Sequence, residues 1–194
     1  APIYYWGILA GSVAGTAGSA NGTGLSATFS GPNGMVRDSQ GNLYVADGSN
    51  HVIRKIDPVT GAVTTFAGTM ASPGIVNATG TAAKFNRPCG LAIDAQDNIY
   101  VADASNNVVR KITPAGVVST FAGAGTAGSA DGAATTATFN SLTDMAITPA
   151  GVMYVADQVN HVIRKIDAGQ VTTIAGLAGT LGNVNGTGSA ARFN

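Results

Sequence analysis

Two histidines and one cysteine are the side chains of this sequence best suited to metal binding or nucleophilic chemistry. His51 and His161 occupy the same place in two copies of one motif, where a third copy has Asn107. A catalytic centre is asymmetric, whereas these histidines recur in register, so they are interpreted as residues that begin a strand. Cys89 has no second cysteine to pair with and is interpreted as a small buried residue. We therefore expect no catalytic residue, no metal and no cofactor.

Acidic and basic residues also recur with the motif. Asp47, Asp103 and Asp157 each stand three residues before an asparagine, and we interpret them as turn-capping residues that accept backbone N–H bonds. Three Arg-Lys pairs recur as well, and we interpret them as charges on an outer strand that resist edge-to-edge association. The pairs are Arg54-Lys55, Arg110-Lys111 and Arg164-Lys165.

Asparagines in the Gly-rich segments match the acceptor pattern for N-glycosylation. They are Asn21, Asn77 and Asn185, each followed two residues later by threonine, and Asp131 stands at the related place in another segment. A tight Gly-type turn explains the same residues without any modification. Both interpretations stay open.

The elements that carry these residues repeat about every 55 residues. Tyr-Val-Ala-Asp occurs at 44–47, 100–103 and 154–157, and each copy leads into a Val- and Ile-rich stretch. The second copy predicts four strands, at 90–94, 98–103, 107–113 and 117–122, separated by turn residues. These strands are too continuously apolar for a sheet with one wet face, and no helix beyond a single turn is expected.

The repeat resembles the NHL-repeat family, of the bacterial secreted type. The resemblance rests on Pro88–Asp94, Asn98–Asp103 and Asn106–Ile112, and it extends from about Phe29 to Asn194. The third unit departs where Ser141-Leu142-Thr143-Asp144 replaces the Pro-x-Gly pattern. The resemblance implies an all-β fold of β-propeller blades, with three four-stranded antiparallel sheets. We expect blade 1 at 30–84, blade 2 at 85–138, and blade 3 with the start of a next unit at 139–194.

Residues 1–29 then hold an extra outer strand and a Gly-rich linker. The strand is expected at 3–10 and lacks partners in its own chain, so it is a candidate for self-association with another copy or a further blade. The residues that would carry this contact are Ile3, Tyr4, Tyr5, Trp6, Ile8 and Leu9. Closed propellers have four to eight blades, so three blades stay open and should complete a larger propeller or assembly.

Composition narrows the function. Ten basic residues balance ten acidic ones, and only 10% of residues are charged, so neither nucleic acid nor an anionic membrane is an expected partner. No apolar run is long enough for a membrane span. We expect a secreted or cell-surface protein with a low-charge surface that contacts copies of itself, other proteins or glycans.

Two functions remain. The first is a non-catalytic structural or protein-binding propeller module that associates with itself, as a dimeric ring or a head-to-tail filament. The alternative is a piece of a larger propeller enzyme, a lyase or hydrolase, with its site in other blades. An enzyme should have polar residues on one blade only at channel-facing positions. The positions taken to face the channel are uniform and mostly apolar: Met35, Leu91 and Met145, and Tyr44, Tyr100 and Tyr154.

Overall fold

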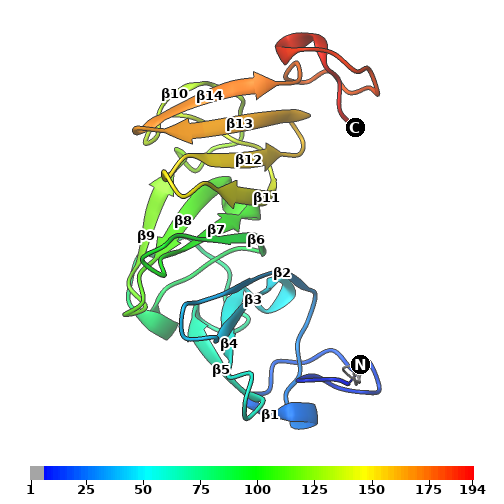
Figure 1. Cartoon of the computed structure of the whole chain (residues 1–194), viewed down its shortest axis with the longest axis vertical. Helices are drawn as coiled ribbons and strands as arrows, with labels where there is room; N and C mark the ends of the chain where they lie inside the picture. The colour runs from blue at the N-terminus through cyan, green and yellow to red at the C-terminus, as the bar shows by residue number, and fades with distance from the viewer. Residues whose placement is uncertain (1–6) are drawn as a thin grey trace, which may run out of the picture.

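The computed structural model describes residues 7–194, which form three antiparallel sheets stacked in chain order (Figure 1). Blade 1 contains β2 (Pro32–Arg37), β3 (Leu43–Asp47), β4 (Val52–Ile56) and β5 (Ala62–Ala67). Blade 2 contains β6 (Pro88–Ile93), β7 (Ile99–Asp103), β8 (Val108–Ile112) and β9 (Val118–Ala122). Blade 3 contains β11 (Leu142–Ile147), β12 (Met153–Asp157), β13 (Val162–Asp167) and β14 (Gln170–Ala175). The all-β fold of unclosed propeller blades is confirmed, with the strands of the second unit within two residues of their predicted bounds.

Each blade has one more strand-like segment than predicted. The two-residue strands β1 (Gly22–Thr23) and β10 (Gly132–Ala133) pair with the outer strands β5 and β14. In blade 2 an isolated bridge between Thr79 and Val117 lies in the same place. The Gly-rich linker that precedes a blade therefore covers the outer edge of that blade, which removes an open edge.

The helical residues in the described part of the chain are single turns of 3-10 helix. Three of these turns lie in linkers, as η1 (Gly24–Ser26), η3 (Gly80–Ala82) and η5 (Gly188–Ala190). Two join the second strand of a blade to the third, as η2 (Gly48–Asn50) and η4 (Ala104–Asn106). No helix among the residues described has the length and apolarity to cross a membrane.

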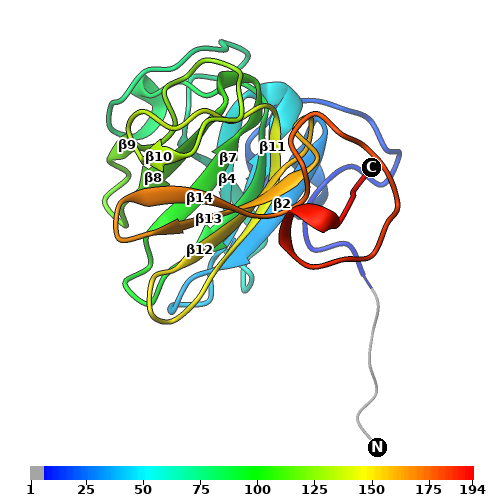
Figure 2. The same ribbon diagram turned by 90° about the horizontal axis from the view of Figure 1, so that it is seen from above.

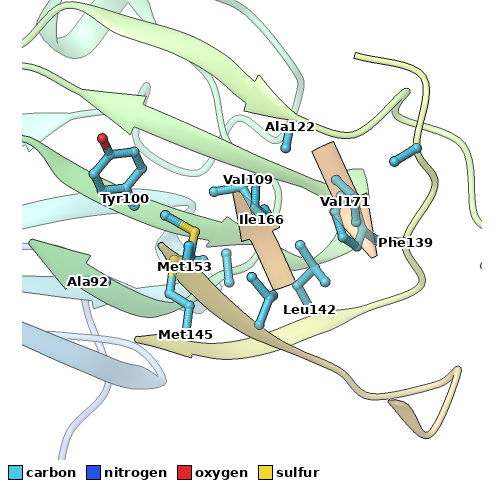
Figure 3. Packing of buried hydrophobic residues seen from close by; sticks show 13 residues of the cluster. Ala92, Tyr100, Val109, Ala122, Phe139, Leu142, Met145, Met153, Ile166 and Val171 are labelled. Atoms are coloured by element: carbon cyan, nitrogen blue, oxygen red, sulfur yellow. The ribbon is translucent and has the colours of Figure 1, made fainter. Parts of the chain in front are cut away.

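The core lies between the blades, where one face of small side chains meets one face of large ones. Between blades 1 and 2, Ala46 and Ala67 pack with Leu91, Val101 and other aliphatic residues of blade 2. Between blades 2 and 3, Ala102 and Ala122 meet Met145, Met153 and their neighbours, which Figure 3 shows from close by. Both faces of blade 2 are therefore buried, which explains its continuously apolar strands.

The positions expected to line the channel lie between blades instead. Leu91 is 6% exposed and Met145 is 7% exposed because each packs on the preceding blade, whereas Met35 has no preceding blade in this chain and is 60% exposed. Tyr44 and Tyr100 are buried, but Tyr154 on the last blade is 38% exposed. The expectation was wrong because the pleat turns these side chains toward a neighbouring sheet, away from the axis.

The innermost strands β2, β6 and β11 pack against one another, and glycine permits their close approach. A Cβ atom at Gly34 would lie 2.7 Å from the carbonyl oxygen of Cys89. A Cβ at Gly90 would lie 2.5 Å from the Cα atom of Asp144. The equivalent residue of blade 3 is Asp144 itself, which is exposed on the open face.

The predicted outer strand at 3–10 lies partly outside the described residues, which exclude Ile3–Trp6. Residues 7–10 are described and form no strand, with Ile8 and Leu9 exposed. Gly11 nevertheless donates to the carbonyl of Gly24 as Gly68 does to that of Gly80, which places it in register with the end of a fourth strand. The sequence register is therefore retained, although no strand among residues 7–194 pairs with residues 7–10.

Adjacent blades are also joined by one polar contact from the start of the third strand. His51, in a left-handed conformation (φ 60°), accepts a hydrogen bond at Nδ1 from the backbone N–H of Arg87, 3.0 Å away. In the next junction Asn107 (φ 56°) accepts through Oδ1 from the N–H of Ser141, 2.9 Å away. His51 thus lies directly before β4, at the strand entry that the sequence predicted, and it also joins blade 1 to blade 2.

This contact predicts a pH dependence at one junction. Burial and the nearby Arg87 lower the pKa of His51 from its ordinary value of 6.5, so folding favours the neutral imidazole. The contribution of His51 to the free energy of unfolding is therefore complete above pH 6.5 and is lost as the pH falls through the lowered pKa. The free energy of unfolding of His51→Asn should equal that of wild type at pH 8. At pH 5 it should exceed that of wild type by about 1 kcal/mol, the contribution of one hydrogen bond. Urea unfolding at both pH values measures the difference. If both proteins lose the same free energy of unfolding between pH 8 and pH 5, the prediction is wrong.

Candidate functional site

The most elaborate polar site in the molecule is a buried arginine that occurs once in each blade. Arg54, Arg110 and Arg164 lie on the third strand and have no exposed surface. Each donates through Nη1 to the aspartate that ends the second strand, at 2.8 Å (Asp47), 2.9 Å (Asp103) and 2.8 Å (Asp157). The aspartates are fully buried as well, so each pair is an ion pair without water contact.

The remaining groups of this arginine cluster come from the linker. In blade 1, Nη1 of Arg54 donates to the carbonyl of Thr28 at 3.1 Å, and Nη2 donates to the carbonyl of Ala20 at 2.9 Å and to Oδ1 of Asn21 at 2.8 Å. Asn50 links the same aspartate, Asp47, to the carbonyl of Gly18. The cluster therefore fastens the linker to its blade.

Blades 2 and 3 repeat these contacts, with one chemical change. Arg110 donates to Asn77 Oδ1 at 2.7 Å, as Arg54 does to Asn21. In blade 3 the acceptor is Asp131, 2.8 Å from Arg164, so this guanidinium contacts two carboxylates. One phenylalanine from each linker lies below the guanidinium carbon, at 5.1 Å (Phe29), 5.1 Å (Phe85) and 5.0 Å (Phe139). The Nε atom of each arginine has no hydrogen-bond acceptor among the described residues.

Burial changes the ionisation of the aspartates in the second and third clusters. Loss of hydration raises the pKa of Asp103 to about 6, while the Asn86 N–H, Asn106 and Arg110 act in the opposite direction. Burial also raises the pKa of Asp157, against the donors Asn160, Asn140 and Arg164. Asp103 nevertheless accepts hydrogen bonds from Arg110, Asn106 and the Asn86 N–H, the contacts that favour its carboxylate form.

The sequence interpretation of the Arg-Lys pairs was wrong for the arginines. They lie on the third strand of the blade, inside the protein, because the ion pair and the linker carbonyls replace their hydration. The lysines follow on the opposite face of the strand, and Lys55 and Lys111 lie 5.7 Å from the ring centres of Tyr44 and Tyr100. The aspartates contact the nearby asparagine, as predicted, but they do not cap the turn that follows: the backbone N–H that Asp47 accepts comes from Ser30, at the end of the linker.

The Asn-x-Thr residues have a structural role in two of three places. Asn21 and Asn77 are exposed on the linker surface, but their Oδ1 atoms accept hydrogen bonds from Arg54 and Arg110. Asn185 stands at the equivalent place in the last linker, and it is exposed. N-glycosylation of these residues stays a prediction.

The remaining candidates for chemistry are not brought together. Within residues 7–194, no group of three or more His, Cys, Asp or Glu side chains is arranged to hold a metal ion. Cys89 is half-buried, not buried as expected, and burial raises the pKa of its thiol, which disfavours the reactive thiolate. His51 and His161 lie on different blades, at equivalent strand starts.

Asp144 is the residue that breaks the uniformity of the blades. It replaces a glycine of the inner strand, lies on the open face of blade 3, and accepts a hydrogen bond from the N–H of Met145 at 2.9 Å. The sequence showed the departure at 141–144, but it was assigned only to a turn. The signal that could have found the arginine cluster was a constant offset: each aspartate precedes its arginine by seven residues.

The repeat matches a known family model. The model for the NHL repeat matches residues 29–56 and 85–112, which contain the inner three strands of blades 1 and 2. The chain carries NHL repeats. The human protein NHL repeat-containing protein 2 is 38% identical over 95 residues, covering 48% of this chain and 13% of that protein. The chain spans 13% or less of the curated relatives it matches.

Solved structures show the same architecture. An auxiliary nutrient binding protein from Bacteroides ovatus is 26% identical, with a TM-score of 0.64 over 78% of this chain and 39% of that protein. A gluconolactonase from Xanthomonas campestris is 15% identical, with a TM-score of 0.56 over 76% of this chain and 48% of that protein. The second likeness concerns the fold alone. In both cases this NHL chain corresponds to less than half of a larger protein.

The arginine cluster predicts unequal effects of two neighbouring substitutions. Arg164→Met leaves Asp157 buried without its cation and should destabilise the protein by about 3–5 kcal/mol. Lys165→Met removes the half-exposed pair with Asp167, whose contribution is about 0–1 kcal/mol. Chemical denaturation monitored by circular dichroism measures both. If both variants lose the same free energy of unfolding, the buried cluster does not stabilise the blade.

Proposed function

We propose that this chain is a non-catalytic structural module whose two open blade faces are covered by further propeller blades, which copies of the same chain supply head to tail. The observation that supports this most directly is the composition of the faces. The leading face of each blade, which meets the preceding blade, has large aliphatic residues. The trailing face has alanines, one tyrosine and one or two Val or Ile residues.

The open faces of this chain belong to these two types. On blade 1 the leading face contains Met35, Leu43, Val45, Ile56 and Val63, equivalent to Leu91, Ile99, Val101, Ile112 and Val118 of blade 2. Met35 is exposed and Leu43 is partly exposed, whereas the other three are buried in a cluster with linker residues, among them Ala27 and Phe29. On blade 3 the open trailing face contains Ala146, Tyr154, Ala156, Ile163 and Ala175, equivalent to Ala92, Tyr100, Ala102, Val109 and Ala122 of blade 2. The leading face of blade 1 thus has the residue types that a trailing face contacts inside the chain. The trailing face of blade 3 likewise has the residue types that a leading face contacts.

Polar groups and surface shape support the same arrangement. His161 (φ 56°) stands where His51 and Asn107 accept an N–H from the next blade. Gly31 (φ 60°) stands where Arg87 and Ser141 donate that N–H. A hollow beside His161 is lined by Thr143, Ile163 and Phe193, and another on blade 1 is lined by Phe29, Pro32 and Val45. Both hollows lie on the open faces, where a neighbouring blade would pack.

We also place the protein outside the cell, at the surface or secreted. This proposal rests on the low charged fraction of 10% and on the exposed Asn-x-Thr residues. Recovery of the protein only from the cytosolic fraction of its source cells would contradict it.

Two substitutions on opposite faces test head-to-tail association. Met35→Asp blocks the leading face and Tyr154→Asp blocks the trailing face, and both positions are already exposed, so neither variant should unfold. Wild type should form concentration-dependent oligomers in analytical ultracentrifugation. Each variant alone should stay monomeric, and an equimolar mixture should form dimers that do not extend, because one competent face of each kind remains.

A monomeric wild-type chain at high concentration would contradict the proposal. Dimers formed by either variant alone would show that like faces pair, which the head-to-tail arrangement does not allow. His161→Ala is the matched control for the polar contact: it should weaken association and leave the stability of the single chain unchanged.

Asp144 predicts that the junction between copies is weaker than the junctions within the chain. Glycines at the equivalent positions allow atoms of the next inner strand to come within 2.5–2.8 Å of a Cβ position, and the Asp144 side chain occupies that space. Asp144→Gly should therefore strengthen association by roughly tenfold, the effect of about 1.4 kcal/mol. Sedimentation of the variant beside wild type measures this change. Unchanged or weaker association would show that inner strands do not meet at this junction.

A further inference from the structure

The linker of blade 1 carries an asparagine followed by glycine inside an arginine cluster. Asn21 is exposed on the linker surface, and Gly22 begins the two-residue strand β1. Nη2 of Arg54 donates to Oδ1 of Asn21 at 2.8 Å, so a fixed cation lies against the carbonyl oxygen of the side-chain amide. A cation in this place stabilises the negative charge that develops on the oxygen when a nucleophile attacks Cγ.

The backbone nitrogen of Gly22 is the nucleophile that the chain places next to this amide. Its attack on Cγ of Asn21 closes a succinimide ring, and the side-chain nitrogen leaves as ammonia with the proton that the Gly22 nitrogen loses. Glycine permits the closure because it has no Cβ to crowd the ring. Water then attacks Cγ, whose oxygen Arg54 polarises, and the bond from Cγ to the Gly22 nitrogen breaks. The backbone is restored and the side chain becomes the carboxylate of aspartate.

The product of this reaction is already present in blade 3. Asp131, followed by Gly132, stands where blade 1 has Asn21-Gly22. Oδ1 of Asp131 lies 2.8 Å from Nη2 of Arg164 and accepts from the hydroxyl of Thr173 at 3.0 Å, and Oδ2 accepts the N–H of Thr173 at 2.9 Å. Figures 1 and 2 show β10, which begins with Gly132, beside β14 at the outer edge of that blade. The site therefore accommodates a carboxylate with both of its oxygens bonded.

Blade 1 has the same donors but an amide nitrogen in place of the second carboxylate oxygen. Oδ1 of Asn21 accepts from Arg54 and lies 3.4 Å from the hydroxyl of Thr65. Thr65 lies opposite Arg54 in the ladder, at the place that Thr173 has in blade 3. Nδ2 of Asn21 is therefore the equivalent of Oδ2 in blade 3, and an amide NH2 cannot accept the N–H of Thr65. Conversion to aspartate supplies this acceptor and adds a charge-assisted bond to the guanidinium.

We propose that Asn21 is a site of spontaneous deamidation, converted to aspartate by attack of the Gly22 nitrogen, and that the product fastens the linker more firmly to blade 1. The Gly22 nitrogen must leave its place in β1 to react. This opening costs little because β1 has two residues and pairs with β5 alone, at the edge of the sheet. Arg54 stays in place meanwhile because Asp47 holds its Nη1 atom. The reaction takes place within one chain and does not depend on association between copies.

Two other asparagines of the chain are matched controls. Asn77 accepts a hydrogen bond from Arg110 at 2.7 Å, but alanine follows it. Asn33 precedes Gly34 in β2, but among residues 7–194 no arginine donates a hydrogen bond to its side chain. Of the three, Asn21 alone combines the cation with the glycine.

Incubation of the wild-type chain at pH 8, followed by peptide mass spectrometry, measures conversion at all three asparagines in one sample. Asn21 should convert roughly tenfold faster than Asn77, where a Cβ crowds the ring. It should also convert faster than Asn33, and mainly to aspartate, because Arg54 polarises Cγ in both steps. If either control converts as fast as Asn21, or if isoaspartate is the main product there, the arginine does not direct the reaction and the proposal is wrong.

Two substitutions test the effect of the product on the blade. Asn21→Asp supplies the product directly, and Asp131→Asn is the reverse change in blade 3. The urea midpoint of unfolding should rise for the first variant and fall for the second. Hydrogen exchange should show added protection of the Thr65 N–H in Asn21→Asp and lost protection of the Thr173 N–H in Asp131→Asn. A midpoint of Asn21→Asp at or below that of wild type, or an unprotected Thr65 N–H, would overturn the stabilising role of the product.

Discussion

The buried ion pair between the arginine of the third strand and the aspartate of the second is the interaction on which the rest of the blade depends. Two charges removed from water are stable only when nearly every donor and acceptor has a partner. Arg110 meets this condition with Asp103, the carbonyls of Lys84 and Val76, and Asn77. Since strand and linker each supply part of the site, neither is complete alone. Each blade of this chain is therefore a structural unit made of a sheet and the linker that precedes it.

The blades could be predicted from the sequence because the same apolar stretches recur three times in register. Any one stretch, such as Val108–Ile112, is too short and apolar to distinguish a strand from a buried helix, but its recurrence after Tyr-Val-Ala-Asp settles the type. The direction in which side chains point was less predictable. Arg54 and Lys55 are adjacent and equally charged, and only the contacts across the blade show that the first is buried and the second is not. Likewise Met35 and Tyr44 lie on strands as expected, but which neighbour they face depends on the pleat and on packing between sheets.

The inner strands of the three blades differ at one position, which holds glycine in blades 1 and 2 and aspartate in blade 3. At Gly34 and Gly90 the backbone of the next blade comes so close that no side chain fits. Asp144 has the same backbone place on the trailing side of blade 3. In the head-to-tail arrangement proposed above, its side chain would keep the following blade further away than the glycines keep blades 2 and 3.

The two kinds of face also determine the symmetry of any larger structure. Two leading faces in contact would place Met35 against Met35 and overfill the junction, while two trailing faces would oppose alanines and leave cavities. Only leading on trailing reproduces the packing seen between Ala102 and Met145 or between Ala46 and Leu91. Such a contact is heterologous, so each added copy presents a fresh open face. Whether the series closes into a ring or continues as a filament then depends on the angle between copies, and Asp144, at the inner edge of that junction, is the residue best placed to change it.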